Sequence, residues 1–214
     1  MPKKKKKQNA NQSADPNAAA APTNSTQPGC ATPPPSPYIP RQYRSKKFYP
    51  WQQQVVDSRK DFNERFVDCI IDKEGNNGKS TLASIADLQG LGIDMPTVDE
   101  GNKLIQSFCN LLLAKETKTP GLVFFDMPRA QNKLQISGLF TAIEQLKKGK
   151  VWDFRHHYKE CWFDSPRIWV FTNMQPDTSL LSVDRWQFWT IKDKKLIRLP
   201  KLGKTNKGDN NTLK

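Results

Sequence analysis

The stretch from Asp72 to Thr81, which reads D-K-E-G-N-N-G-K-S-T, has the residue types and the spacing of a phosphate-binding loop. Lys79 can reach the outer phosphates of a nucleotide, and Ser80 can ligate Mg²⁺. Glycines let the backbone turn, so that its N–H groups and the following helix N-terminus can approach phosphate oxygens. The predicted nucleotide-binding residues are Gly75, Asn76, Asn77, Gly78, Lys79, Ser80 and Thr81. The strict pattern has glycine where this chain has Lys73, so an ordinary strand–turn–helix is the alternative for this stretch alone.

Two further polar residues close apolar runs in the second half of the chain. Asp126 follows Leu122–Phe125, where a carboxylate can hold Mg²⁺ together with Ser80. Asn173 follows the run at 168–171 and can orient an attacking water or the γ-phosphate. The alternatives are a turn-capping aspartate and an Asx turn before a proline. We therefore predict Lys79, Asp126 and Asn173 as catalytic side chains.

The elements that must position these residues follow from hydrophobic periodicity. Helical patterns cover residues 53–65, 82–88, 104–112 and 131–148, strand patterns cover 66–71, 122–125, 167–171 and 186–191, and 150–163 has the pattern of a hairpin. This alternation predicts an α/β fold, a P-loop NTPase sheet that is mostly parallel with helices on both faces. Ligands of such sheets bind at the carboxyl ends of the strands, where the candidate residues all lie.

Charge is distributed unevenly along the 214 residues. Residues 1–47 carry nine basic and one acidic side chain and residues 201–214 carry four and one, so that +11 of the net +13 lies in the two tails. Residues 1–45 are rich in Pro, Ala, Asn and Gln, which predicts a disordered arm; residues 46–199 form the predicted ATPase domain, and 200–214 a disordered basic tail. The run Lys3–Lys7 is similar to a nuclear localisation signal that an import receptor reads, and a basic arm that binds nucleic acid without specificity is the alternative. We therefore expect the protein in the nucleus.

The cysteines and the hydropathy exclude other classes of protein. Four cysteines are far apart and form no C-x-x-C pair, which favours a reducing compartment over a disulfide or metal framework. No apolar run approaches the roughly 20 residues of a membrane span, so no membrane partner is expected.

Six stretches together carry a resemblance to a known family. They are Tyr49–Gln52, Asp72–Thr81, Phe125–Arg129, Leu146–Lys150, Val170–Asn173 and Asp184–Trp186. In residue type, order and spacing, over about residues 48–192, they resemble the superfamily 3 helicase domain of replication-initiator (Rep) proteins of small circular single-stranded DNA viruses and satellites, nearest to nanovirus- or alphasatellite-like members. That branch commonly carries Asp-x-x-Gly-Asn-x-Gly-Lys-Ser, which accounts for the lysine at 73.

The resemblance implies a ring-forming, ATP-driven 3′→5′ helicase, expected to be a homohexamer, that uses Mg²⁺ and acts on single-stranded DNA. It implies that Asn173 is the sensor and that Arg185 is a finger offered to the ATP of the neighbouring subunit. The basic hairpin would face the central channel and grip DNA through Lys148, Lys150, His157 and Lys159. Cations and aromatic rings in alternation also suit single strands on physical grounds. Alternatively the aromatics Trp152, Phe154, Trp162 and Phe163 pack the sheet, which we favour for most of them.

Two departures from the family limit what the resemblance implies. Many related ATPases have a second acidic residue after the strand-terminal aspartate, whereas Met127 stands here, and no general base can be named. This favours an alternative function, a nuclear nucleic-acid-binding protein with a degenerate P-loop that does not hydrolyse nucleotide. Full-length Reps also nick DNA with a histidine pair and a tyrosine. Here His156 and His157 are adjacent inside the helicase region, so no nicking is expected from Tyr43, and a separate Rep would supply it.

Overall fold

The computed structural model describes residues 38–96, 98, 100–127 and 133–200 of the chain. All of these belong to one compact unit, Pro37–Lys214. The run Lys3–Lys7, most of the predicted arm and nearly all of the predicted basic tail lie outside the described residues. Within the segment predicted as an arm, Arg41–Tyr43 forms a short 3₁₀ helix, η1.

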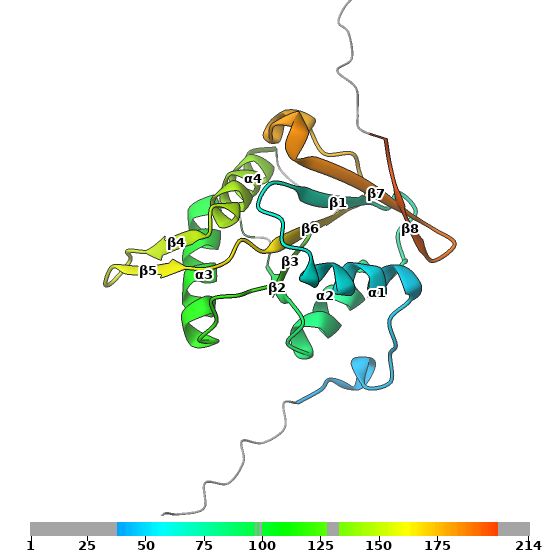
Figure 1. Ribbon diagram of the computed structural model, residues 1–214, viewed down its shortest axis with the longest axis horizontal. Coiled ribbons are helices and arrows are strands. Elements are labelled where there is room, and N and C mark those ends of the chain that lie inside the picture. The colour runs from blue at the N-terminus through cyan, green and yellow to red at the C-terminus, as the bar shows by residue number, and fades with distance from the viewer. Residues whose placement is uncertain (1–37, 97, 99, 128–132, 201–214) are drawn as a thin grey trace, which may run out of the picture. The chain divides into compact units, whose positions relative to one another are not determined.

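A six-stranded sheet forms the centre of this unit (Figure 1). Its strands in chain order are β1 (Val67–Ile71), β2 (Ile93–Met95), β3 (Leu122–Asp126), β6 (Arg167–Thr172), β7 (Trp186–Lys192) and β8 (Lys195–Arg198). In space the order is β2-β3-β6-β1-β7-β8, in which every neighbouring pair is parallel except β7 with β8. The predicted α/β fold with a mostly parallel sheet is therefore confirmed.

Helices cover both faces of the sheet. On one face lie α1 (Pro50–Asp57) and α2 (Lys79–Leu88), and on the other lie α3 (Gly101–Ala114) and α4 (Lys133–Lys147). Short 3₁₀ helices follow α1 and precede β7: η2 (Ser58–Lys60), η3 (Thr178–Leu180) and η4 (Val183–Arg185). None of the helices among the described residues is long and apolar enough to cross a lipid bilayer.

The first helix is shorter than the predicted helix 53–65. It begins at Pro50, whose fixed φ suits a first turn, and the Gln52 side chain accepts a hydrogen bond of 2.8 Å from the Tyr49 N–H. It ends at Asp57 because the Ser58 hydroxyl donates to the Val55 carbonyl at 2.6 Å, and the chain tightens into η2. The prediction was therefore wrong for residues 61–65, which form the loop that leads into β1.

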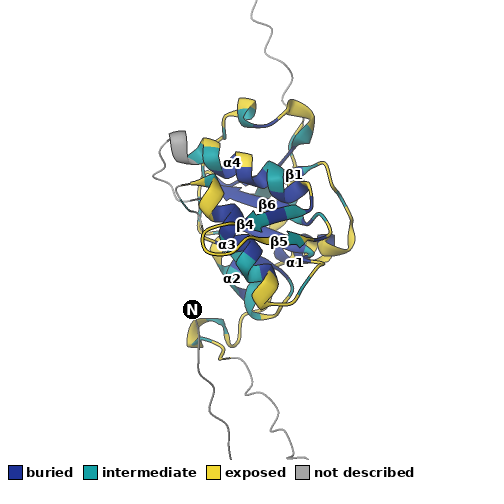
Figure 2. Ribbon diagram, turned by 90° about the vertical axis from the view of Figure 1, so that its left-hand side faces the viewer, coloured by how far each residue is buried: buried dark blue, intermediate teal, exposed yellow. Residues whose placement is uncertain are grey.

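The core has two layers because side chains of a strand alternate between faces. In β1, Val67, Cys69 and Ile71 pack towards α3 and α4, whereas Ile70 packs towards α1 and α2. Figure 2 shows the buried strands in dark blue between the inner sides of the helices. Trp169, almost fully buried beneath α1, is the largest side chain of β6 in the α1/α2 layer.

A separate two-stranded hairpin, β4 (Lys150–Asp153) with β5 (Lys159–Trp162), lies beside α3. The hairpin predicted for 150–163 is therefore confirmed. Gly149 connects it to α4. Its φ is +73°, and a Cβ there would lie 2.6 Å from the Phe163 carbonyl oxygen, so only glycine fits this close approach.

Candidate functional site

The chain between β1 and α2, residues 72–78, forms a tight loop that we call the glycine loop. Its backbone has positive φ at Gly75 (+78°), Asn76 (+60°) and Gly78 (+82°), where glycine and asparagine are the least strained residues. Gly78 is the residue before the first turn of α2. The Gln52 side chain of α1 donates to its carbonyl oxygen at 2.8 Å and supports the loop from the side. The predicted strand–loop–helix geometry is confirmed.

Asp72 of the glycine loop forms a buried ion pair with Lys79, the first residue of α2. The Lys79 Nζ lies 2.7 Å from Asp72 Oδ2, and the two side chains are 8% and 3% exposed. Asp72 Oδ1 also accepts from the Gly75 N–H at 3.1 Å and from Asn77 Nδ2 at 2.9 Å. Burial raises the pKa of Asp72, but the hydrogen bonds from Lys79, Asn77 and Gly75 outweigh it and hold the pKa below its ordinary value. The lysine predicted to bind phosphate therefore has an anionic partner in the adjacent glycine loop.

The strand order brings Asn173 against the same loop. Its Nδ2 donates to the Asp72 carbonyl oxygen at 2.7 Å, and the Asp72 N–H donates to the Thr172 carbonyl at 2.9 Å. Both contacts exist because β6 is the parallel neighbour of β1, with Ile71 level with Thr172. Asn173 and the glycine loop are about a hundred residues apart in the sequence, but the pairing of β6 with β1 brings them into contact.

Asp126 ends β3, two strands away from β1 in the same sheet. It is level with Phe171 of β6, which is level with Ile70 of β1, so its Cα lies about 10 Å from β1 at the usual strand spacing. Leu122 and Phe124 pack in the α1/α2 layer, so alternation turns Asp126 towards α2 as well. Lys79, Asn173 and Asp126 therefore gather at the carboxyl ends of β1, β6 and β3, which we call the carboxyl edge.

Ser80 and Thr81 lie in the first turn of α2, where Ser80 is exposed and Thr81 is half-buried. The first N–H groups of a helix lack intrahelical partners and can donate to an anion. Within the described ranges, His, Cys, Asp and Glu side chains do not gather in a group of three that could hold a metal ion. A metal at Ser80 and Asp126 would therefore need further oxygen ligands from a substrate or from water.

Sequence reasoning missed Asp94, which lies in the short strand β2 on the α2 side of the sheet. The Ser84 hydroxyl of α2 donates to its Oδ2 at 3.4 Å. Burial, and to a smaller extent the negative charges of Asp87 and Asp126, raise the pKa of Asp94 to about 6. The only sequence signal for Asp94 was its position between the apolar residues Ile93 and Met95. A strand of three residues is too short to give a periodic pattern, so β2 was not predicted.

Arg185 lies at the opposite edge of the sheet from the glycine loop. It precedes Trp186, which is level with Val67, the first residue of β1. Five strand residues, or roughly 17 Å, separate this level from the carboxyl edge. Its side chain is 20% exposed, and its Nε lies 3.6 Å from Glu144 Oε1 of α4. Arg185 therefore does not join the residues at its own glycine loop.

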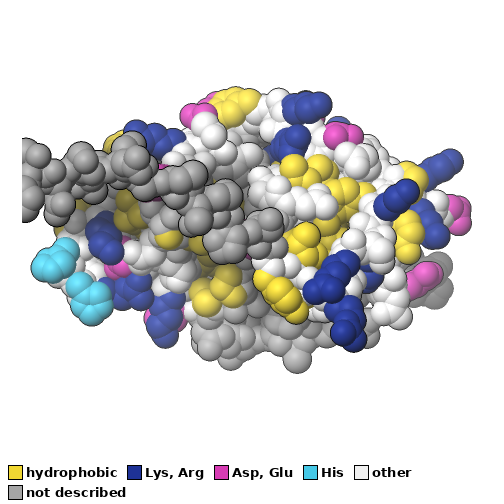
Figure 3. Space-filling model, turned by 90° about the horizontal axis from the view of Figure 1, so that it is seen from below, with side chains coloured by type: hydrophobic (Ala, Val, Ile, Leu, Met, Phe, Trp, Pro, Cys, Tyr) yellow, Lys and Arg dark blue, Asp and Glu magenta, His cyan; other side chains and the backbone are white. Residues whose placement is uncertain are grey.

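The hairpin presents the predicted basic residues to solvent. Lys148, His157 and Lys159 are exposed, and Lys159 Nζ donates to Asn110 Oδ1 at 3.2 Å. Lys150 is half-buried, pairs with Glu160 at 2.9 Å and lies over the Trp162 ring, 4.5 Å from its centroid. In Figure 3 the two histidines, in cyan, lie together at the left of the view among Lys and Arg side chains.

The aromatic residues of the hairpin divide between core and surface. Phe163 is buried and packs edge-on against Phe108 at 5.3 Å, and Trp152 is half-buried. Phe154 is 59% exposed and Trp162 is 62% exposed. Our interpretation that most of these rings pack the sheet was therefore wrong for these two, because the hairpin is a separate ribbon and only one of its faces meets α3.

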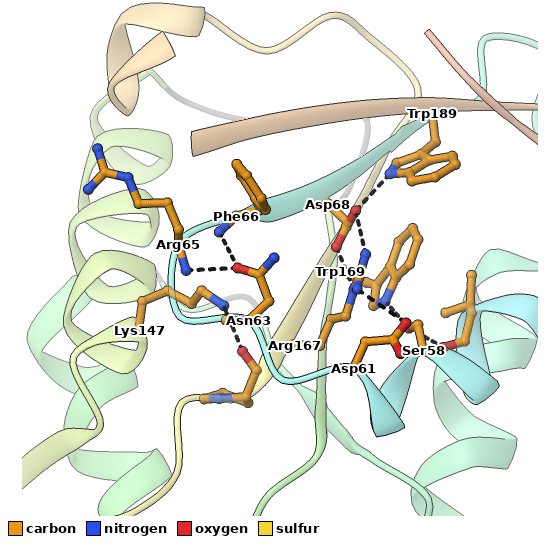
Figure 4. Close-up of polar contacts among 12 residues, drawn as sticks. Ser58, Asp61, Asn63, Arg65, Phe66, Asp68, Lys147, Arg167, Trp169 and Trp189 are labelled. Carbon is orange, nitrogen blue, oxygen red and sulfur yellow. Dashed lines mark hydrogen bonds and ion pairs between the residues drawn. The ribbon is translucent and has the colours of Figure 1, made fainter. Parts of the chain in front are cut away.

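A second polar network lies at the amino ends of β1 and β6 (Figure 4). Asp68 is almost fully buried, and it accepts from Arg167 Nε at 2.9 Å and from Trp189 Nε1 at 2.8 Å. Burial raises the pKa of Asp68 although Arg167 opposes the shift. The Trp169 indole donates to the Ser58 hydroxyl at 3.1 Å. These polar atoms satisfy one another, so the network supports the sheet.

A scan with models of known protein families gives no match to this chain, and a search of curated proteins gives none either. Function is therefore inferred from the geometry at the carboxyl edge, together with the sequence resemblance.

Proposed function

We propose that this chain is a superfamily 3-type ATPase domain that unwinds DNA during replication of a small circular single-stranded DNA virus or satellite. One observation carries the proposal: the glycine loop with Lys79, the strand-terminal Asn173 and the strand-terminal Asp126 lie at one edge of a parallel sheet, on the adjacent strands β1, β6 and β3. An incidental Gly-Lys-Ser turn would not require the other two residues beside it.

Nucleotide phosphates would bind at the glycine loop and the first turn of α2. Lys79 would supply a positive charge, and the N–H groups of Ser80 and Thr81 would donate to phosphate oxygens. A cavity of about 370 Å³ opens beside the loop between the ends of β1 and β7, lined among others by Ile71, Lys73 and Ile191. Its size and mixed lining suit the nucleobase or the sugar.

The residues at the carboxyl edge fit a magnesium ion. Mg²⁺ is usually held by one or two protein oxygens and completes its shell with substrate phosphates and waters. The Ser80 hydroxyl and the Asp126 carboxylate would provide those oxygens, and the bound ion would neutralise charge on the phosphates.

For hydrolysis, Asn173 would orient the attacking water, since its amide is fixed by the Asp72 carbonyl. Arg185 is too far from its own loop and would act on the ATP of a neighbouring subunit. The glycine loop lies at the carboxyl edge and Arg185 at the opposite edge of the sheet, so the two can meet only between subunits arranged head to tail. Such contacts can close into a ring, which is expected to be a hexamer. The exposed hairpin, with its cations and the rings of Phe154 and Trp162, would bind single-stranded DNA.

A second candidate is a nuclear nucleic-acid-binding protein that holds nucleotide without hydrolysing it. The Asp72–Lys79 pair favours it, because the lysine is already engaged. Met127 favours it as well, because no acidic side chain follows Asp126. Its side chain is buried in the α3/α4 layer, away from Asp126, and its N–H donates to the Phe171 carbonyl at 2.9 Å.

ATP turnover with and without single-stranded DNA tests the proposal. Lys79→Ala should remove nearly all turnover. The variant should be less stable, because Asp72 stays buried without its counter-charge, so turnover is measured at a temperature where circular dichroism shows the domain folded. The matched control is Lys118→Ala, an exposed lysine before β3 at the opposite edge, which should keep wild-type turnover. Equal turnover in Lys79→Ala and wild type would remove the phosphate-loop assignment. ATP binding without turnover under any DNA condition would favour the non-hydrolysing module.

Location and partners extend the proposal. The run Lys3–Lys7 would direct the protein to the host nucleus through an import receptor, and a separate nicking Rep would act with it. Removal of residues 1–45 should abolish nuclear accumulation while ATP turnover remains.

A further inference from the structure

The Asp72 carboxylate is surrounded by the donors that a phosphate group would need. Three groups donate to it: the Lys79 ammonium at 2.7 Å, Asn77 Nδ2 at 2.9 Å and the Gly75 backbone N–H at 3.1 Å. The side chain is only 3% exposed, so water contributes little to this shell. A carboxylate with an ammonium and a loop amide around it has the same kind of environment as a bound phosphate oxygen.

A phosphate chain and this carboxylate cannot both keep the same partners. Their negative charges repel each other, and burial weakens the screening by solvent. The ammonium of Lys79 has three N–H groups, but a turn towards an incoming phosphate weakens its bond to Asp72 Oδ2. Gly75 has a single N–H, which Asp72 already takes.

We infer that Asp72 is an internal anion that fills the glycine loop and that a nucleotide must displace from Lys79 in order to bind. This inference rests on the proposed nucleotide site and adds to it a preference for ligands with several linked phosphates. A ligand with several linked phosphates has enough charge to compete with the carboxylate, whereas a single phosphate does not. Asn173 donates a hydrogen bond to the Asp72 backbone carbonyl. Displacement of the Asp72 carboxylate from Lys79 would therefore also affect Asn173 at the end of β6.

Neutral replacements of Asp72 test this role. Asp72→Asn keeps the shape of the side chain and Asp72→Ser removes most of it, and both remove the negative charge. Binding of pyrophosphate, orthophosphate and ATP is measured by titration calorimetry at constant ionic strength. Both variants should bind pyrophosphate and ATP more tightly than wild type by on the order of tenfold or more, because one negative charge that repels the phosphates is removed. Orthophosphate should bind measurably only to the variants.

The matched control is Glu64→Gln, which removes one negative charge from an exposed position in the loop before β1, at the opposite end of the sheet. Its affinity for pyrophosphate should stay within about twofold of wild type, since exposed charges are well screened. A second readout is the rate at which an acylating reagent modifies Lys79, followed by mass spectrometry. The rate should rise in both Asp72 variants and not in the control.

The outcomes are separable. Tighter binding in both variants with an unchanged control supports the inference. Unchanged or weaker binding in the folded variants overturns it, and Asp72 then serves to hold Lys79 ready for phosphate. Failure of every chain to bind pyrophosphate overturns it as well. Binding with no ATP hydrolysis in wild type would count against the proposed function alone, because affinity and turnover are measured independently.

Discussion

Arg167→Met should strongly destabilise the domain at neutral pH. Methionine keeps much of the apolar stem but removes the guanidinium that neutralises Asp68, a side chain that is 1% exposed. The carboxylate would keep the Trp189 N–H as a partner and lose its counter-charge. Breaking a buried ion pair from one side costs about 3–5 kcal/mol, a large part of the stability of a domain of this size. The melting temperature should fall by roughly 6–20 °C.

The effect should depend on pH in a defined direction. The pKa of Asp68 is raised in the folded protein, mainly by burial. Its contribution to stability is therefore fully present below the pKa of the unfolded chain and is lost as pH rises through the folded pKa. Without Arg167 the folded pKa rises further, so the deficit of the variant should be largest at neutral pH and should shrink as pH falls towards about 4, where Asp68 is protonated.

The assay is thermal and urea unfolding of wild type and variant between pH 4 and 7.5. Arg65→Met is the matched control, because Arg65 pairs with Asp184 on the surface and both side chains are more than half exposed; its melting temperature should change far less. The double variant Asp68→Asn, Arg167→Met should recover part of the loss, since no buried charge remains. A melting temperature for Arg167→Met within 2 °C of wild type at pH 7, together with an unchanged pH profile, would refute this account.

Three further predictions follow from other contacts. Gly101→Ala places a Cβ 2.4 Å from the Gly138 carbonyl oxygen where α3 meets α4, so it should cost about 1–3 kcal/mol in urea unfolding, and a cost near zero would contradict the close approach. Burial lowers the pKa of Lys147 to about 8, so wild type should gain stability relative to Lys147→Gln as pH rises from about 8 to 10.5; a flat difference would show that the amine is not desolvated. Arg185→Ala should lower ATP turnover by on the order of 10³-fold or more and spare ATP binding, and its mixture with Lys79→Ala should be more active than either variant alone. If sedimentation shows that the two variants assemble together and the mixture has no higher ATP turnover than either alone, the role of Arg185 is the ion pair with Glu144.

Much of the fold could be predicted because its signals are local. The apolar run 66–71, the glycine loop and the start of α2 follow one another within about twenty residues, and each obeys its own periodicity or turn chemistry. Asp126 and Asn173 were placed at strand ends for the same reason. The short strands β2 and β8 were missed, because three residues in one case and two apolar residues between Lys195 and Arg198 in the other are too few for a periodic pattern.

The sequence by itself determined which segments are strands and helices and that Lys79, Asp126 and Asn173 each stand at the end of a strand or the start of a helix. Only the tertiary structure decided that β6 lies between β1 and β3, which brings Asn173 onto the Asp72 carbonyl. It also decided that Lys79 is paired with Asp72 and that Arg185 lies at the far edge of the sheet. Periodicity reports the local path of the backbone, whereas strand order and side-chain partners depend on which distant surfaces bury one another.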